Sequence, residues 1–284
     1  MASPRIRPMD ESDVMAVDDV AVAAFTELNA RMGAPPYAGA PPAAASVRLR
    51  RLLDTDPGGA WVAERDGEVV GAALALVREG LWGLSLFVVA PGAQSGGLGR
   101  ELLARAWEHG RDARGFVILA SRDPRALRAY VRLGLDLHPA LDAAGVARGV
   151  TAPPGLRLWE PADGAWAGPL TRRVRGAAHG GDLEALLEGG LLATVLPGRG
   201  YAFARGTALK LLAADDEDAA RILLADHLAR AAGEPVSVEW ITSAQQWAVR
   251  SCVEAGLELH AHGAVLTGGE LGPMQPYLPS GPYL

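Results

Sequence analysis

The spacing of apolar and polar residues predicts strands and helices that alternate along the first 140 positions. A short strand is expected over 5–8, followed by a helix near residue 11 whose start carries acidic capping side chains. Proline and glycine interrupt regular structure over 33–45, and a second helix is expected over 46–53. We expect the segment 33–45 to be a mobile loop.

Two apolar runs, 60–64 and 69–77, flank an Asp-Gly pair, which is a strong signal for a two-residue hairpin turn. A third strand is expected over 84–89 and leads into a glycine-rich turn. Helical spacing then follows over 98–109. Strand, glycine turn and helix are therefore consecutive.

The next elements complete a unit of the α/β class with a mixed sheet. A buried strand is expected over 116–120, and a helix over 124–133 begins after the capping residue Asp123. A short strand is expected over 134–138.

The chain repeats part of its own sequence at an offset of 122 residues. Residues 121–138 (SRDPRALRAYVRLGLDLH) lie over 243–260 (SAQQWAVRSCVEAGLELH), and eight of these 18 positions are identical. An ungapped match of this extent indicates an internal duplication, in which one fold occurs twice. A weaker echo pairs 5–7 with 173–175.

The middle of the chain predicts a boundary between two domains. Residues 151–170 are rich in Pro, Gly and Trp and show no periodicity, which is typical of a connection. A chain of 284 residues with 49% hydrophobic composition fits two domains of ordinary size. We therefore expect a first domain over 1–152, a linker over 153–170 and a second domain over 171–284.

Charge and composition favour small-molecule chemistry. The net charge is −6 and Lys210 is the only lysine among 27 basic residues, so the basic surface that binds nucleic acid is not expected. No apolar stretch reaches the roughly 18 residues of a membrane helix, and the N-terminus lacks the apolar run of a signal peptide. We expect a soluble cytoplasmic protein, a monomer or homodimer, that binds neither nucleic acid nor membranes.

The single cysteine limits the chemistry further. Cys252 has no second thiol with which to form an internal disulfide or a cysteine-based zinc site. We read it as a small buried apolar residue, and we expect no metal.

The segment QSGGLG (94–99) has the chemistry of an anion site. Glycines allow backbone amides to approach a diphosphate closely, and the N-terminus of the following helix adds partial positive charge. A glycine-rich turn without a ligand is the alternative. A dinucleotide-binding loop would need Gly-x-Gly-x-x-Gly after an early strand, and the segment does not have this pattern.

Two motifs taken together resemble the GNAT superfamily of N-acyltransferases. The first, V-x-P-x-x-Q-x-x-G-x-G, spans 89–99, and the second, D-x-x-A-x-x-A-Y-x-x-x-G-L, spans 123–135. The family usually has Asn at Asp123, an aromatic residue at Ala129 and Phe at Leu135. The resemblance implies two tandem GNAT-like α/β domains and acetyl-CoA, or a related acyl-CoA, as co-substrate.

The resemblance also implies roles for individual residues. Backbone amides from Gln94 to Arg100 would hold the pyrophosphate, and the backbone of Phe87 to Val89 would pair with the pantetheine arm as an added strand does. The residues expected to bind the cofactor are Phe87, Val88, Val89, Gln94, Ser95, Gly96, Gly97, Leu98, Gly99, Arg100, Asp123, Ala126 and Tyr130.

Acyl transfer needs a proton for the departing thiolate and a base for the incoming amine. The resemblance implies Tyr130 as the catalytic proton donor, with a backbone amide near Phe87 to Val89 stabilising the oxyanion. Glu64 and Glu79 lie on or near predicted strands, and a water relay is a further alternative. No base is assigned on this basis.

The second copy lacks both features that the resemblance assigns to the active site. Four acidic residues, 215–218, stand where a glycine turn is expected and would repel a diphosphate. Cys252 occupies the position of Tyr130. We expect this copy to be degenerate and to act as a structural part or as a wall of the acceptor pocket.

Two further segments of the second copy carry expectations. The proline-rich tail 274–284 cannot form a regular helix and is expected to be an extended segment docked on a groove. His179 lies in a glycine-rich loop and is expected to be exposed to solvent.

The sequence therefore predicts an N-acetyltransferase that moves an acetyl group from acetyl-CoA to a primary amine by direct attack in a ternary complex. A small-molecule acceptor is preferred, because the loop 33–45 can enclose a compact ligand. A non-catalytic acyl-CoA sensor or scaffold stays open, as does a structural protein without a ligand.

Overall fold

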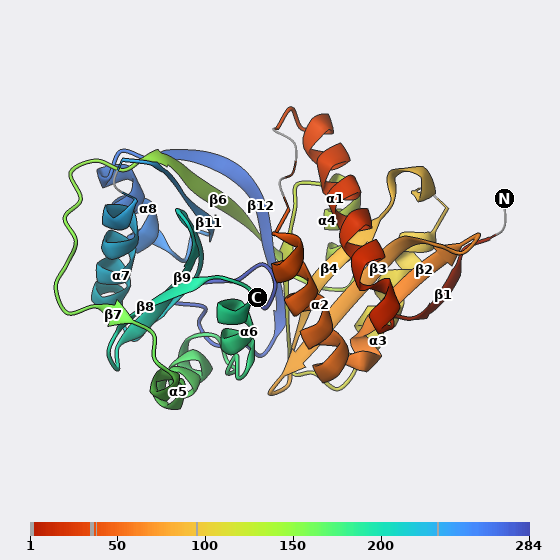
Figure 1. The fold of residues 1–284 in the computed structure, drawn as a ribbon, viewed down its shortest axis with the longest axis horizontal. Helices are drawn as coiled ribbons and strands as arrows, with labels where there is room; N and C mark the ends of the chain where they lie inside the picture. Colours follow the sequence, from red (N-terminus) through yellow and green to blue (C-terminus); the bar gives the residue numbers. More distant parts are fainter. Residues whose placement is uncertain (1–2, 35–36, 38, 95, 232) are drawn as a thin grey trace. The chain divides into compact units, whose positions relative to one another are not determined.

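A computed structural model describes residues 3–34, 37, 39–94, 96–231 and 233–284. Internal contacts divide the chain into two compact units, one of residues 1–77 and 82–113, the other of residues 78–81 and 114–284. Each unit is built from strands and helices (Figure 1). Within the described residues, no helix is long and apolar enough to cross a membrane. The α/β class expected from the sequence is confirmed.

The described residues of the first unit form four strands and three α-helices. Its elements are β1 (Arg5–Pro8), η1 (Glu11–Asp13), α1 (Val14–Arg31), α2 (Pro42–Thr55), η2 (Pro57–Gly59), β2 (Ala60–Arg65), β3 (Glu68–Arg78), β4 (Leu81–Val89), η3 (Pro91–Ala93) and α3 (Leu98–Glu108). The strands lie in the order β1-β2-β3-β4. Helix α2 begins at Pro42, within the segment 33–45 that we expected to be a loop, and part of that segment lies outside the described residues.

The hairpin between β2 and β3 confirms the turn that the Asp-Gly pair predicts. Asp66 and Gly67 have φ angles of 53° and 84°, the left-handed values that a tight turn of this kind requires. Arg65 lies opposite Glu68 in the antiparallel pairing.

The second unit contains the remaining elements. They are β5 (Gly115–Ala120), α4 (Pro124–Val131), β6 (Asp136–Val146), β7 (Arg157–Leu158), η4 (Pro161–Asp163), α5 (Gly164–Val174), α6 (Asp182–Glu188), β8 (Leu192–Leu196), β9 (Gly200–Arg205), β10 (Ala208–Ala214), α7 (Glu217–Arg230), β11 (Pro235–Ile241), α8 (Gln246–Glu254), β12 (Glu258–Gly269) and β13 (Tyr277–Leu278). The strands follow the order β5-β12-β6-β11-β10-β9-β8-β7, and β13 pairs with β10.

The last strands of the two sequence copies are exchanged. Strand β12 of the second copy lies between β5 and β6 of the first, and β6 in turn lies between β12 and β11. The exchanged strands pair antiparallel with each other from Glu258↔Ala144 to Thr267↔Asp136. Helix α4 begins at residue 124 and α8 at 246, and β6 begins at 136 and β12 at 258, so both pairs of elements keep the offset of 122.

The predicted linker 153–170 is not irregular. It contains β7, η4 and the first turns of α5. Proline at the start of η4 is compatible with this structure, because the first helical positions need no N–H donor. The placement of the boundary between residues 152 and 171 stays a prediction.

Strand β7 and the turn η4 show which residues of the second copy correspond to β1 and η1 of the first. Arg157 pairs with Asp163 at 2.7 Å, as Arg7 pairs with Asp13 at 2.6 Å, and each aspartate ends a short 3-10 turn. Hydrogen bonding to Arg157 lowers the pKa of Asp163 to about 2. The predicted correspondence between residues 5–7 and residues 173–175 is therefore wrong, because 173–175 lie at the end of helix α5.

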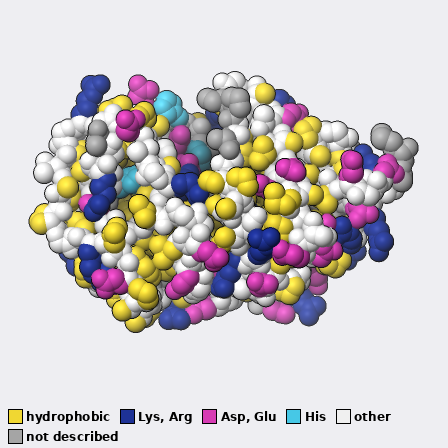
Figure 2. Space-filling model, viewed as in Figure 1, with side chains coloured by type: hydrophobic (Ala, Val, Ile, Leu, Met, Phe, Trp, Pro, Cys, Tyr) yellow, Lys and Arg dark blue, Asp and Glu magenta, His cyan; other side chains and the backbone are white. Residues whose placement is uncertain are grey.

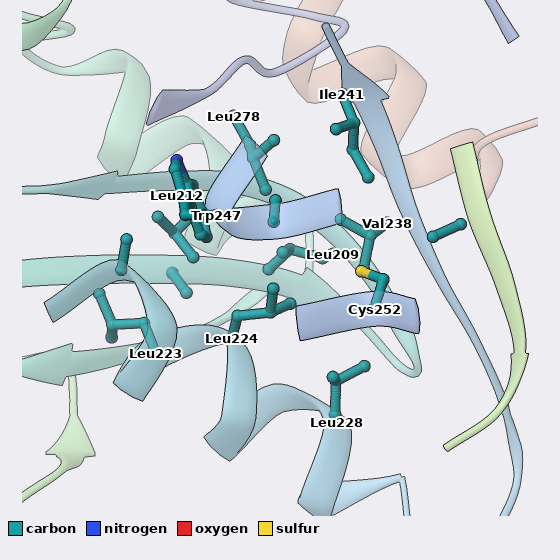
Figure 3. Close-up of a cluster of buried hydrophobic side chains, with 14 of the residues drawn as sticks. Leu209, Leu212, Leu223, Leu224, Leu228, Val238, Ile241, Trp247, Cys252 and Leu278 are labelled. Atoms are coloured by element: carbon teal, nitrogen blue, oxygen red, sulfur yellow. The ribbon is translucent and has the colours of Figure 1, made fainter. Parts of the chain in front are cut away.

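The core of the second copy lies between two helices and the sheet. Figure 3 shows its apolar side chains meeting from α7, α8 and the strands; the labelled residues are Leu209, Leu212, Leu223, Leu224, Leu228, Val238, Ile241, Trp247, Cys252 and Leu278. Cys252 is fully buried, and burial raises the pKa of its thiol to about 12. It packs as the small apolar residue that we expected.

The tail docks on β10, as its composition predicts. Leu278 lies opposite Leu212, and Tyr277 lies opposite Ala213. The Tyr277 hydroxyl donates to the Leu284 carbonyl oxygen at 2.7 Å and lies 2.9 Å from His179 Nε2. His179 is only 1% exposed, so the prediction that it faces solvent is wrong. The tail therefore covers the loop that carries His179.

We expect Gly263→Ala to destabilise the protein because β12 and β5 approach closely at this point. A Cβ on Gly263 would lie 2.1 Å from the Ala120 carbonyl oxygen, so the backbone must shift. The free energy of unfolding should fall by roughly 1–3 kcal/mol, as for other overpacked sites. Denaturant unfolding measures this loss.

Gly281→Ala is the matched control, since a Cβ there meets nothing within 4 Å. It should change the free energy of unfolding by less than about 0.5 kcal/mol. Equal stability of the two variants would contradict the close approach of β12 to β5.

Candidate functional site

The glycine-rich turn forms a helix start with no capping side chain at the end of β4. Gly97 is the N-cap of α3, and its φ of 84° is a left-handed value that favours glycine. The first amides of a helix have no acceptor within that helix, and the helix dipole places positive charge there. The start of α3 therefore has the electrostatics of an anion site.

The turn is anchored on both sides of its exposed part. Gln94 Nε2 donates to the Val89 carbonyl oxygen at 3.0 Å and lies 3.4 Å from Glu27 Oε2. On the other side, a Cβ on Gly99 would lie 3.3 Å from the Phe87 ring, so α3 packs closely on β4. Between these anchors Gly96 is exposed, and no described residue beyond its chain neighbours lies within 4 Å of a Cβ placed there.

The remaining loop residues differ in exposure. Leu98 is buried and holds the first turn of α3 against the core, whereas Arg100 is exposed. Ser95 lies outside the described residues, so its predicted role stays a prediction. Phe87 and Val89 are half-buried at the end of β4, and Val88 is buried.

Two charged side chains on the helices of the first unit were not among the residues that the motifs indicated. Arg48 of α2 donates to the Ser85 carbonyl oxygen at 2.5 Å and to its hydroxyl at 3.1 Å. Burial raises the pKa of the half-buried Asp18 carboxyl on α1 above its usual value, and nearby Asp19 raises it further. Helical periodicity gives no signal for these contacts, because they depend on how the helices pack on the strand.

The second motif lies in the second unit, on α4. Asp123 is the N-cap of this helix and accepts from the Arg125 backbone N–H at 2.9 Å. Its other carboxylate oxygen lies 2.7 Å from Arg125 Nη2. Asp123 therefore stabilises the start of α4, and its predicted role in cofactor binding stays a prediction, as does that of half-buried Ala126.

Tyr130 is a buried phenol that keeps its proton. Its residue is 5% exposed. Burial raises the pKa of Tyr130 well above the usual value of 10, and the Asp123 carboxylate raises it further. The hydroxyl is therefore fully protonated at neutral pH, which is the state that a proton donor requires.

The predicted residues thus fall into two groups. Those from Phe87 to Arg100 gather around the end of β4 in the first unit, and Asp123, Ala126 and Tyr130 share α4 and its cap in the second unit.

Comparisons with known proteins agree with both motifs. Residues 8–135 match the profile of the Acetyltransferase (GNAT) family. A stretch of 89 residues is 36% identical to mycothiol acetyltransferase of Streptomyces avermitilis and covers 29% of each protein. The chain therefore spans less than a third of the length of this curated relative in the match.

Solved structures share the fold over nearly the whole chain. A crystal structure from Pyrococcus horikoshii has a TM-score of 0.80 at 15% identity and covers 99% of this chain and 96% of its own. A tandem GNAT protein from the clavulanic acid biosynthesis pathway has a TM-score of 0.58 at 17% identity, with 94% and 98% covered. At these identities the likeness shows that the fold is shared.

Substitutions of Asp123 separate its capping bond from its charge. Asp123→Ala removes the acceptor for the Arg125 N–H and should lower the free energy of unfolding by about 1 kcal/mol. Asp123→Asn keeps a side-chain oxygen and should cost less, since the partly exposed ion pair contributes little. Urea unfolding measures both values, and equal losses would show that the carboxylate acts through its charge.

Proposed function

We propose that the chain is an N-acetyltransferase, because residues 8–135 match the profile of the Acetyltransferase (GNAT) family. It transfers the acetyl group of acetyl-CoA to a primary amine of a small-molecule acceptor, by direct attack in a ternary complex. The observation that carries the proposal is the left-handed glycine at the start of α3, which no described side chain caps and which follows β4 through η3 and the glycine-rich turn.

The loop residues fit a pyrophosphate. Backbone amides from Gln94 to Arg100 would hold it, since glycines without side chains let an anion approach the main chain. Among the described residues outside its chain neighbours, the Arg100 guanidinium alone comes as near as 4.0 Å to a Cβ position at Gly97. The main chain of Phe87 to Val89 would pair with the pantetheine arm.

Tyr130 supplies the proton in this proposal. Its hydroxyl would protonate the thiolate as it leaves, and its raised pKa keeps that proton on the phenol before reaction. Positioned proton transfer of this kind contributes roughly 10²–10⁴ in rate.

The second copy is assigned no acetyl-CoA site. Asp216 occupies the start of α7, where it accepts from the Ala219 N–H at 2.8 Å and pairs with Arg199 at 2.7 Å. Strand β13 of the tail pairs with β10, much as the pantetheine arm is proposed to pair with β4. The second copy therefore already carries a strand of its own chain at this position.

A small-molecule acceptor is supported by the relative named mycothiol acetyltransferase, although its match covers 29% of the chain. The alternative is an acyl-CoA sensor or scaffold. Such a protein would bind acyl-CoA but would not transfer its acyl group.

Gly97→Glu should abolish acetyl-CoA binding, because a carboxylate would stand at the start of α3. Calorimetric titration should give one equivalent bound by the wild type and none by the variant. Gly198→Glu is a matched control, since Gly198 is also exposed, left-handed (φ of 72°) and free of contacts within 4 Å. Loss of binding in both variants, or in neither, would contradict the assignment of the loop.

Tyr130→Phe should lower kcat for acetyl transfer by about 10²-fold and leave the Kd for acetyl-CoA unchanged. The rate is measured with a panel of amines in fixed-time assays that detect the released thiol of CoA. Tyr201→Phe, at another fully buried tyrosine, controls for loss of a buried hydroxyl. Binding with no turnover in the wild type would favour the sensor.

A further inference from the structure

A cavity of about 210 Å³ lies within the second unit. Its walls come mainly from four segments: the start of β6, the junction of β11 with α8, the second half of β12, and residues 271–274. All four segments belong to the same compact unit. Since an engineered apolar cavity of about 150 Å³ binds benzene, this cavity can hold one aromatic ring with a small substituent.

One wall of the cavity is polar and is built by the exchanged strands. His138 of β6 lies opposite Val265 of β12, and Thr267 lies two residues further along β12, so the three side chains share one face of the sheet. His138 Nε2 lies 3.0 Å from Thr267 Oγ1. In either tautomer of the imidazole, this pair keeps one N–H or O–H proton and one lone pair for a ligand.

A second wall is held in place by a buried amide. Gln245 is 3% exposed. Its Oε1 accepts from the Thr242 backbone N–H at 2.9 Å and from the Thr242 hydroxyl at 2.7 Å, and its Nε2 donates to the Met274 carbonyl oxygen at 2.9 Å. Because the Thr242 hydroxyl gives its proton to Gln245, it is available to a ligand only as an acceptor.

The segment 271–274 is tied to the end of α5. The Gly272 backbone N–H donates to the Arg175 carbonyl oxygen at 2.9 Å, and the Met274 backbone N–H donates to the Val174 carbonyl oxygen at 2.7 Å. With the bond from Gln245, these contacts fix this wall without a ligand. A preformed cavity lowers the entropy that binding costs.

The remaining walls are apolar. Trp240, Leu271 and Met274 pack against the buried cluster that contains Val265. The Trp240 ring meets the His262 ring edge to face, with centroids 4.3 Å apart, so its orientation is supported from one side. Indole rings and thioether sulfurs both make favourable contacts with aromatic rings. These walls therefore favour an aromatic ligand.

Two residues of these walls have strained backbones. Trp240 has a φ of 64° and Met274 a φ of 52°, left-handed values that residues with a side chain rarely adopt. Trp240 also lies in the register shift of β11 between Val238 and Ile241, and such bulges redirect side chains. Strain of this kind persists where the surroundings hold a residue in place, and it concentrates at ligand sites.

The charge of the lining selects a neutral ligand. The described residues that line the cavity include no Asp, Glu, Lys or Arg. A charged ligand would lose its hydration there without gaining an ion pair. His138 is exposed, and Figure 2 shows histidine side chains at the surface over β6 and β12. The polar wall of the cavity is therefore reached from solvent.

We propose that this cavity binds a neutral aromatic molecule that carries one hydroxyl or amide group. The ring lies against Trp240 and Met274, and the polar group both donates to and accepts from the pair of His138 and Thr267. Thr242 supplies a further acceptor. None of these residues is among those proposed to bind acetyl-CoA, so the site does not rest on the acetyltransferase function.

Titration of the full-length protein with phenol, followed by NMR signals of the ligand, tests the proposal. Phenol should bind saturably with one equivalent, and benzoate, which is charged at pH 7, should bind at least about tenfold more weakly. Thr267→Val removes the hydroxyl at nearly constant shape. The ratio of the Kd for phenol to the Kd for toluene should rise about fivefold in this variant, because one hydrogen bond is lost.

Ala244→Phe places a ring at the cavity beside the start of α8 and should abolish binding of both phenol and toluene. It replaces Thr267→Val if that variant does not fold, as judged by circular dichroism. Thr194→Val is the matched control, since Thr194 is also a half-buried threonine on a strand of the second unit, and it should keep both wild-type Kd values.

Three results would overturn the proposal. The first is wild-type protein that shows no saturable binding of phenol. The second is phenol binding that the Thr267 and Ala244 variants both leave unchanged, which would place the ligand elsewhere. The third is benzoate bound as tightly as phenol, which would contradict a neutral ligand.

Discussion

The backbone ladder between β6 and β12 is the interaction on which the second unit depends. It joins the last strands of the two sequence copies over the register from Glu258↔Ala144 to Thr267↔Asp136. Because β12 also pairs with β5, and β6 with β11, neither copy has a complete sheet from its own strands. This explains why β5, α4 and β6, which belong to the first copy by sequence, fall into the second compact unit.

The exchange also gives the second copy a structural part in the sheet that carries β5. The second copy has lost the glycine turn and the tyrosine that mark the first, and its strand β10 pairs with the tail. Its last strand nevertheless pairs with β5 from Ala264↔Ala120 to Gly269↔Gly115. Strand β10 and strand β12 of the second copy therefore have different partners, the tail and β5 respectively.

Much of the local structure could be predicted from the sequence. The Asp-Gly hairpin, the glycine start of α3 and the cap at Asp123 all depend on residues close together in the chain. Such features follow from backbone preferences that a short segment carries by itself.

The features that sequence reasoning missed depend on residues far apart in the chain. The bulges at Trp240 and His262 exist only once β6 lies between β11 and β12, and no local pattern specifies that neighbour. Burial of His179 depends on Tyr277, 98 residues later. The strand β7 was read as a connection because only two residues, Arg157 and Leu158, pair.

The pairing of β5 with β12 has a consequence for how the chain is made. Residues such as Ala120 and Ala264 become neighbours only after more than a hundred intervening residues have left the ribosome. Until then the edge of β5 lacks its partner, and an open strand edge is a site for misassembly with other chains. Contacts of such long range also slow folding, because the chain loses the entropy of loop closure before the strands gain any pairing. Synthesis of the first copy therefore ends well before that copy is able to finish its sheet.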